Sequence, residues 1–336
     1  MSAAVRVRSL PRPAPVRPLL PWWAAAGWIA VPFAAAALAH GRFAWSVVTA
    51  AAVQGLFAVS WVLLAVSGLP SLGHALPYGA GAYTVAFLVH RGIVQAADPN
   101  GATPAALTAA AAAAGGCAGA LQGRLVRNLA PVWTAAITLA TVEAAHSLAT
   151  MWMAPVLHGG IVTDTAIPVA ALAGDRAATW ITAAAFAAGV LLVTVLVRSR
   201  TGVALRAAAG ADRDADALGF DAPRLRLFAF VTAGAIAGVA GALAAQSTGH
   251  VSPAMVSWQT SLFAPAAALL GGAGTVVGPA AAGYLIGGIA QLVDAPSGLK
   301  LLAFAAVLAA AGLRDPRHVL GAAFSWNAPP ERRGLP

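Results

Sequence analysis

The chain has 336 residues, of which 60% are hydrophobic and only 9% are charged. Because about 25% of the residues in soluble domains are charged, this composition excludes an ordinary soluble protein and indicates an integral membrane protein. The 35 glycines and 22 prolines are spread through the apolar runs without a collagen period, as is common in membrane helices. We therefore expect an all-α integral membrane protein, a polytopic helical bundle of about ten spans with some helices discontinuous.

Lysine and cysteine each occur once, and each restricts the possible functions. Lys300 stands between two leucines, outside any G-x-x-x-x-G-K-[ST] sequence, so the chain has no phosphate-binding P-loop and should not hydrolyse ATP by itself. With Cys117 alone, neither an intrachain disulfide nor a cysteine zinc cluster can form. Cys117 lies in the apolar run 109–119 and is expected to pack as a small apolar residue.

Apolar runs of about bilayer length follow one another along the chain. A spanning helix needs about 20 apolar residues, and runs bounded by charge, proline or glycine clusters give ten candidates. The expected spans are 20–39, 43–66, 73–89, 103–123, 129–148, 179–197, 227–248, 259–271, 279–293 and 299–313. They form one transmembrane domain, 20–315, between an Arg/Pro-rich segment, 1–19, and a C-terminal tail, 316–336.

The basic residues fall mainly on one side of the expected bundle. With the N-terminus in the cytoplasm, 16 of the 20 lie in cytoplasmic segments; the exceptions are Arg42, Arg91, Arg176 and Lys300. Since short cytoplasmic loops carry an excess of basic residues, both termini are predicted to be cytoplasmic. The first span ends in Ala37-Leu38-Ala39 like a secretory signal, but it exceeds the usual apolar core of about 7–15 residues, which favours an uncleaved helix.

The third, eighth and ninth expected spans are short or interrupted by glycine and proline. The residues concerned are Gly73, Pro77, Gly79 and Gly81 in the third span, and Gly271, Gly272, Gly274, Gly278 and Pro279 where the eighth meets the ninth. Short or broken segments in the two halves of a chain point to discontinuous helices that gate a transport site. Small residues also permit close helix packing, and the pattern leaves both interpretations open.

The longest internal hydrophilic segment is the loop 198–226, on the predicted cytoplasmic side. From Thr201 to Gly219 it is predicted to be helical, with Gly219 as the left-handed residue that stops the helix. Such a helix either docks onto another subunit or is solvated and touches nothing. Its DRDAD run resembles a calcium loop but has Ala217 and Pro223 where glycine and glutamate are needed, so no metal site is expected.

Three ionisable residues inside the expected spans are functional candidates by default: His74, Glu143 and His146. Glu143 and His146 are three positions apart and share a helix face, so they could relay protons, or one could contact a polar substrate. Alternatively, they satisfy each other, or a neighbouring broken helix satisfies them, and their role is purely structural. A di-iron bundle needs two Glu-x-x-His pairs, and the sequence has only this one. No Ser/His/Asp or Cys/His set with recognisable spacing indicates an enzyme.

Three segments form an ordered set of motifs. Residues 68–86 read GLPSLGHALPYGAGAYTVA, residues 200–230 read RTGVALRAAAGADRDADALGFDAPRLRLFAF, and 241–285 contain HVSPAMVSW and LLGGAGTVVGPAAAGYL. In the same order they resemble the GLxSLGHAAFFGIGAYTAA signature, the coupling segment, and the YVSP and LGGLGTLWGPVLGA motifs of the bacterial branched-chain amino-acid ABC transporter permeases. Thr138 and Glu143 match that family's TLAFAEI more weakly, and the resemblance covers roughly residues 40–315.

The resemblance implies a permease subunit of the bacterial inner membrane that forms a translocation path for a branched-chain amino acid or a related small polar solute. The implied partners are a second permease subunit, two cytoplasmic ATPase subunits, a periplasmic or lipid-anchored substrate-binding protein and the lipid bilayer, with no nucleic acid. ATP and magnesium would be bound by the ATPases, so this chain needs no cofactor. The ATPase-coupling residues would be Arg206, Asp212, Asp216 and Gly219. The residues of the translocation path would be Gly73, His74, Tyr83, Thr138, Glu143 and His146.

Some positions depart from the family pattern. Pro77 replaces an aromatic residue, Arg213 and Asp214 stand where glutamate and alanine are usual, and LHGGIVTDTAIP replaces LTGGxxGL after the fifth span. The last change lies where the substrate path is expected, so the substrate stays open among branched-chain amino acids, urea, short amides and aromatic acids.

Two other classes of function fit the sequence. A proton-coupled secondary transporter or channel would use Glu143 and His146 as proton carriers and would need neither a docking helix nor an ATPase. A scaffold subunit of a membrane complex would have no translocation path. The sequence also leaves open whether the second permease is a different chain or a second copy.

Overall fold

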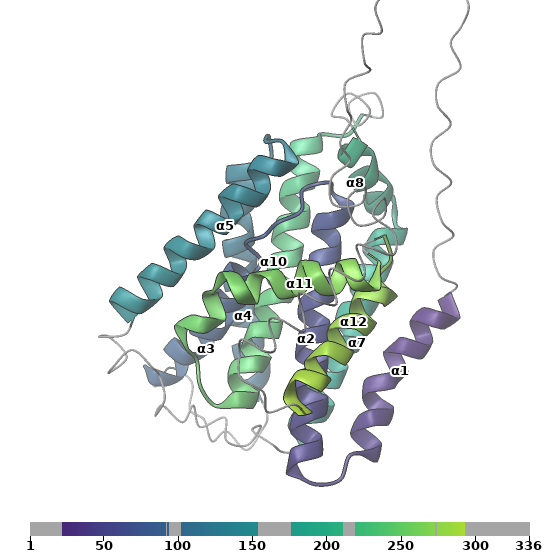
Figure 1. Ribbon diagram of the computed structural model, residues 1–336, viewed down its shortest axis with the longest axis vertical. Helices are drawn as coiled ribbons and strands as arrows, with labels where there is room; N and C mark the ends of the chain where they lie inside the picture. The colour runs from purple at the N-terminus through teal and green to yellow at the C-terminus, as the bar shows by residue number, and fades with distance from the viewer. Residues whose placement is uncertain are drawn as a thin grey trace, which may run out of the picture.

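The computed structural model describes residues 22–91, 93, 102–153, 176–210, 219–272 and 274–292, which form a bundle of helices (Figure 1). The helices are α1 (Trp22–Leu38), α2 (Arg42–Val66), α3 (Ala75–His90), α4 (Ala102–Val126), α5 (Pro131–Leu148), α7 (Arg176–Arg198), α8 (Arg200–Gly210), α10 (Ala222–Thr248), α11 (Trp258–Gly271) and α12 (Val277–Leu292). A π-helical turn, η1 (Ala149–Met153), extends α5, and a 3-10 turn, η2 (Pro253–Val256), precedes α11.

The first nine expected spans each coincide with a helix. The tenth, 299–313, and both terminal segments lie outside the described residues. Among the described helices, four are long and apolar enough to cross a membrane: Arg42–Val66, Ala105–Val126, Arg176–Arg198 and Ala222–Thr248. The described chain is therefore all-helical and suits a multi-pass membrane protein, while the total of ten spans stays a prediction.

The start of α10 differs from its expected position at residue 227. The helix begins at Ala222 because Asp221 caps it, its carboxylate accepting a hydrogen bond from the Arg224 amide at 3.0 Å. Pro223 sits in the first turn, where a missing N–H costs nothing. A cap and an early proline thus extend the helix into the hydrophilic loop.

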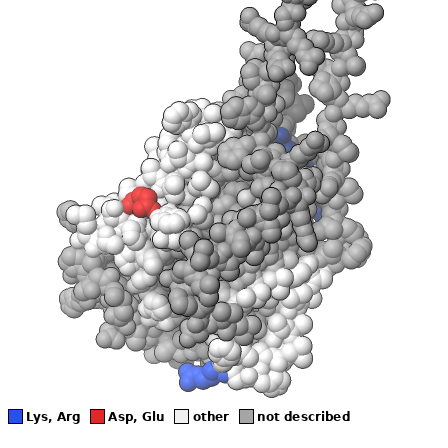
Figure 2. All heavy atoms as spheres, viewed as in Figure 1, with Lys and Arg blue, Asp and Glu red and all other residues white. Residues whose placement is uncertain are grey.

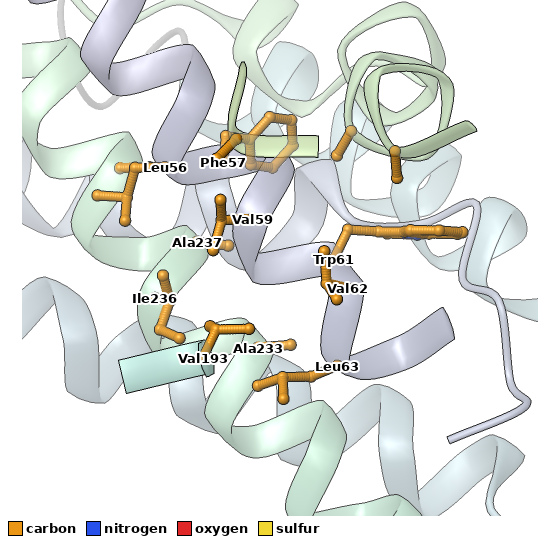
Figure 3. Packing of buried hydrophobic residues seen from close by; sticks show 14 of the residues in the cluster. Leu56, Phe57, Val59, Trp61, Val62, Leu63, Val193, Ala233, Ile236 and Ala237 are labelled. Carbon is orange, nitrogen blue, oxygen red and sulfur yellow. The ribbon is translucent and has the colours of Figure 1, made fainter. Parts of the chain in front are cut away.

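The central helix of the bundle is α2. Its side chains are buried on nearly every side between Ala51 and Leu64. Figure 3 shows Val59 and Leu63 packed in one apolar cluster with Ala233 of α10 and Val193 of α7. A helix that is buried all round belongs at the centre of a bundle, so α2 is the element around which the others are placed.

Glycines bring α4, α10 and α3 into backbone contact. A Cβ on Gly115 or Gly119 of α4 would overlap the backbone of α10, and one on Gly234 would overlap α4. Gly81 of α3 lies in the same way against Gly238 of α10. Because helices in lipid associate through van der Waals packing, such close approach stabilises this group of three helices.

The expected interruption of the third span does not occur where it was predicted, because α3 is continuous over Ala75–His90. Pro77 lies in the first turn, where its missing N–H has no helical partner to lose. Gly79 and Gly81 serve packing, since a Cβ on the first would overlap η2 and one on the second would overlap α10. The irregular segment lies before the helix, at residues 67–74.

The eighth and ninth spans are short and separated, as predicted. They form α11, of 14 residues, and α12, of 16 residues. Gly272 follows α11 with a φ of 90°, and Gly274 faces open space. Gly271 and Gly278 lie against each other so closely that a Cβ on either would overlap the other's backbone. Pro279 lies in the first turn of α12, where it is tolerated.

The predicted coupling helix is described in part. Its first half is α8, and residues 211–218, which include Asp212 and Asp216, lie outside the described residues. Gly219 has a φ of 76°, the left-handed conformation predicted for it. α8 follows α7 after Ser199 alone, and Gly202 lies so close to Val197 that a Cβ would overlap it.

Cys117, which was expected to pack as a small apolar residue, is exposed on α4 within the described chain. The interface with α10 is made by Gly115 and Gly119, and residues two apart on a helix point in different directions. The cysteine therefore lies on the outer surface of α4.

The arginines gather at one end of the bundle, where α2, α4 and α7 end and α10 begins, next to α8 (Figure 1). The described arginines there are Arg124, Arg127, Arg198, Arg200, Arg206, Arg224 and Arg226; those at the opposite end are Arg42, Arg91 and Arg176. Between the ends, the described part of the face in Figure 2 is mostly uncharged. This distribution matches a bundle that crosses a bilayer with its arginine-rich end in the cytoplasm.

Candidate functional site

An irregular segment, residues 67–74, runs through the interior of the bundle between α2 and α3; we call it the interior loop. Ser71 and His74 on it are almost completely buried. Non-helical backbone at membrane depth is tolerated only where protein or water satisfies its polar groups. The Trp61 indole donates to the Ser71 carbonyl at 2.7 Å, and the Ser261 hydroxyl of α11 accepts from the Ala75 amide at 2.9 Å.

Two further helices satisfy the middle of the interior loop. Thr138 of α5 accepts a hydrogen bond from the Leu72 amide at 3.1 Å. Gln122 of α4 donates from its amide nitrogen to the Gly73 carbonyl at 2.9 Å and to the Thr141 hydroxyl at 2.8 Å. A Cβ on Gly73 would overlap the backbone of Thr138, so only glycine fits where the loop crosses α5.

His74 ends the interior loop in a fully enclosed position. Its Nε2 is 2.7 Å from the Ser60 hydroxyl, and its ring stacks on Phe57 with 5.3 Å between the centroids. Ser60 donates its hydroxyl hydrogen to the Phe57 carbonyl at 2.7 Å, so it accepts from His74. His74 therefore carries a hydrogen on Nε2.

The structure thus joins three of the predicted path residues, Gly73, His74 and Thr138, into one buried network. Tyr83 lies elsewhere on α3, in an apolar cluster with Leu107 and Val251. All four residues are buried, so in this conformation none of them faces an open passage.

Glu143 and His146 lie together on α5 but do not pair. His146 is half-buried, and its Nδ1 donates to the Pro253 carbonyl of η2 at 3.0 Å. Glu143 is exposed, and within the described residues it makes no hydrogen bond or ion pair. Of the structural alternatives, mutual pairing is therefore not seen: an i, i+3 spacing allows contact, but a neighbouring segment, η2, holds the histidine.

Glu143 belongs to a face of α5 that the rest of the described chain leaves uncovered. The exposed residues of this face are Val132, Trp133, Ala136, Ala140, Glu143, Ala144, Ser147 and Leu148. In Figure 1, α5 lies at the edge of the bundle. Ala136, Ala140 and Ala144 repeat every four residues, the small-residue spacing at which membrane helices approach closely. A carboxylate in this face is costly against lipid and needs water or a polar partner.

The other candidate surface is α8, at the arginine-rich end. Its buried side packs Ala208 against Ala222 of α10, while Val203 on its other side is 54% exposed. Arg206 donates to the Val197 carbonyl at the end of α7 at 2.9 Å, so it fixes the turn between the two helices. Within the described chain, the exposed side of α8 is left uncovered.

The sequence reading missed Ser60, Gln122 and Ser261, which hold the interior loop. Each is a polar residue inside an expected span, so the criterion that selected His74 would have found them had it included uncharged side chains. Among the described residues, no three of His, Cys, Asp and Glu come together to hold a metal ion.

Comparison with known proteins gives one match. A family model described as "Branched-chain amino acid transport system / permease component" matches residues 43–311, which include every described helix except α1 and the first residue of α2. Searches of curated proteins and of solved structures found no match.

Proposed function

Because the chain belongs to the family of permease components of branched-chain amino acid transport systems, we propose that it is the membrane-spanning permease subunit of an ABC importer. With a second permease subunit it forms the path for a branched-chain amino acid or a related small polar solute. Two cytoplasmic ATPase subunits, which bind ATP and magnesium, drive the cycle. A periplasmic or lipid-anchored binding protein delivers the solute.

The uncovered face of α5 supports this function most directly. Its small residues suit close approach of a second membrane protein, and its single carboxylate requires water or a polar group. A path between two permeases supplies a second membrane protein for the small residues and a polar environment for the carboxylate. We place Glu143 on this path, with His146 beside it, while Gly73, His74 and Thr138 hold the interior loop behind it.

Coupling to the ATPases is assigned to α8 and the loop that follows it to Gly219. α8 is at the arginine-rich end, which the positive-inside rule assigns to the cytoplasm, and its outer side is uncovered. Movement of α8 toward or away from the bundle would open the path alternately to either side, so the permease acts as a two-state element biased from both faces.

The competing function, a proton-coupled transporter, would use Glu143 and His146 as a relay. The structure gives this function little support, because His146 donates to a backbone carbonyl and Glu143 points away from the described protein. In the importer, Glu143 is a polar contact for solute or for the second permease.

A cysteine accessibility experiment tests the path. Ala144 on α5 and Cys117 on α4 are both exposed in the chain alone. In the assembled complex, Ala144→Cys in a Cys117→Ser background should react with a charged, water-soluble thiol reagent. The native Cys117 should stay unreactive because it faces lipid. If the cysteine at position 144 is as unreactive as Cys117, the path does not run along α5.

A further inference from the structure

A buried arginine at the start of α10 connects three helices at the arginine-rich end. Arg226 is 9% exposed. Its Nη1 donates to the Arg127 carbonyl at 3.2 Å and its Nη2 donates to the Ala208 carbonyl at 2.8 Å. The first carbonyl directly follows α4, and the second lies in the last turn of α8.

The Arg127 carbonyl lies just past the last turn of α4, where carbonyls have no partner within the helix and carry the negative end of the helix dipole. The Ala208 carbonyl belongs to the last described turn of α8. A guanidinium presents several donors in a planar fork, so one arginine can bind two carbonyls that belong to different helices. Lysine, with a single compact ammonium group, does not match this geometry.

Arg226 stands at a junction between α8 and the interior of the bundle. On one side, Ala209 of α8 packs against Gly68, the start of the interior loop, so closely that a Cβ on Gly68 would lie 2.7 Å from the Ala209 Cα. On the other side, α4 carries Gln122, whose side chain binds the Gly73 carbonyl of the same loop. α8 therefore reaches the interior loop directly and, through Arg226, by way of α4.

We propose that Arg226 is a positioning residue that locks α8 to α4 and α10, so that a displacement of α8 moves the glycine-packed α4 and α10 together. This role rests on the proposed coupling function of α8. Without Arg226, α8 would still dock onto an ATPase, but its displacement would no longer carry α4 with it. ATP would then be hydrolysed without a matching movement of the path.

The test uses the complete importer in proteoliposomes and measures both ATP hydrolysis and solute uptake. Arg226→Gln should still assemble with the ATPases and hydrolyse ATP, while uptake per ATP falls about tenfold or more, as expected for the loss of a buried charge-assisted hydrogen bond. The uptake per ATP of Arg226→Lys should lie between that of the wild type and that of Arg226→Gln. Arg224→Gln is the matched control, because Arg224 lies on the same turn with its side chain 82% exposed, paired to Asp221. An unchanged ratio of uptake to hydrolysis in Arg226→Gln would overturn the proposal.

A second measurement decides the matter if Arg226→Gln does not assemble. Spin labels on Leu125→Cys of α4 and Val203→Cys of α8, both exposed, are placed in a Cys117→Ser chain that keeps Arg226. The distance between the labels should be the same in the nucleotide-free and ATP-trapped complexes. A change of that distance between the two states would show that α8 and α4 move separately, which contradicts the proposal.

Uptake by the wild-type complex distinguishes a failure of the Arg226 proposal from a failure of the proposed importer function. If wild-type uptake does not depend on the ATPases, the importer function itself fails. If wild-type uptake needs ATP but Arg226→Gln transports as much solute per ATP as the wild type, only the role of Arg226 fails.

Discussion

At the scale of single residues, the interior of this protein is organised by uncharged polar side chains that satisfy the interior loop. Ser60 donates to the Phe57 carbonyl and accepts from His74, so one hydroxyl uses both of its capacities at a fully buried position. In a membrane interior no water replaces a lost partner, and an unsatisfied group there is expensive. His74 is therefore held in one orientation by its neighbours, with a hydrogen on Nε2.

Replacement of Ser60 by alanine should destabilise the protein by about 1–3 kcal/mol, because the His74 Nε2 hydrogen is left buried without an acceptor. Ser46 provides the matched control, since it lies in the same helix and also donates to the carbonyl three residues before it, but this hydrogen bond is exposed and involves no histidine. Ser46→Ala should change stability by less than about 0.5 kcal/mol. Thermal unfolding of both variants in detergent checks this, and equal midpoints would show that the Ser60–His74 bond contributes nothing.

At the scale of elements, composition and spacing predicted nine helices of the described chain closely. They also predicted the break between α11 and α12 and the left-handed Gly219. These are properties of local sequence, set by apolar length and by glycine. For the third span the sequence left open a broken helix or close packing, and α3 is continuous, with the irregular segment before it.

The errors concern features that depend on neighbouring helices. A glycine that breaks a helix and a glycine that packs against another backbone look the same in sequence, and only the position of α10 beside Gly81 distinguishes them. Glu143 and His146 are spaced to pair, but the position of η2 beside α5 decides that they do not. Likewise, nothing local to Arg226 indicates that it binds the ends of α4 and α8.

Two substitutions in α3 distinguish packing from gating. Pro77→Ala should leave stability and uptake close to wild type, because the first turn of a helix needs no N–H at that position. Gly81→Ala should cost about 1–3 kcal/mol of stability, because its Cβ would overlap the Gly238 backbone. Thermal unfolding and uptake are measured for both. A folded Pro77→Ala protein that no longer transports would contradict the structural role and favour a gating function for this proline.

At the scale of the whole molecule, the bundle has two unlike ends and one uncovered side. The end that contains α8 carries most of the described arginines, and the α5 side carries the exposed Glu143. The family assigns the chain to a transport system as its permease component, and the proposed importer has partners on both sides of the membrane. The two ends and the open side provide a separate surface for each kind of partner.

The orientation of the bundle is tested by labelling intact cells. In a Cys117→Ser background, Ile93→Cys near the end of α3 should react with an impermeant thiol reagent from outside, because Ile93 is exposed at the arginine-poor end. Val203→Cys on α8 should react only after the membrane is permeabilised. Labelling of position 203 from outside would invert the orientation and remove α8 as the site of ATPase docking.

The central claim is that this chain is the permease of an ATP-driven importer, and uptake of a labelled branched-chain amino acid into proteoliposomes that contain the complete complex tests it most directly. We predict that uptake requires both the ATPase subunits and ATP, and that collapse of the proton gradient leaves the initial rate nearly unchanged. Glu143→Gln should retain ATP-dependent uptake with altered affinity, because glutamine keeps the size and most of the hydrogen-bonding capacity of a polar contact but cannot carry a proton. Uptake that needs the proton gradient but not ATP, and that is abolished in Glu143→Gln, would contradict the account.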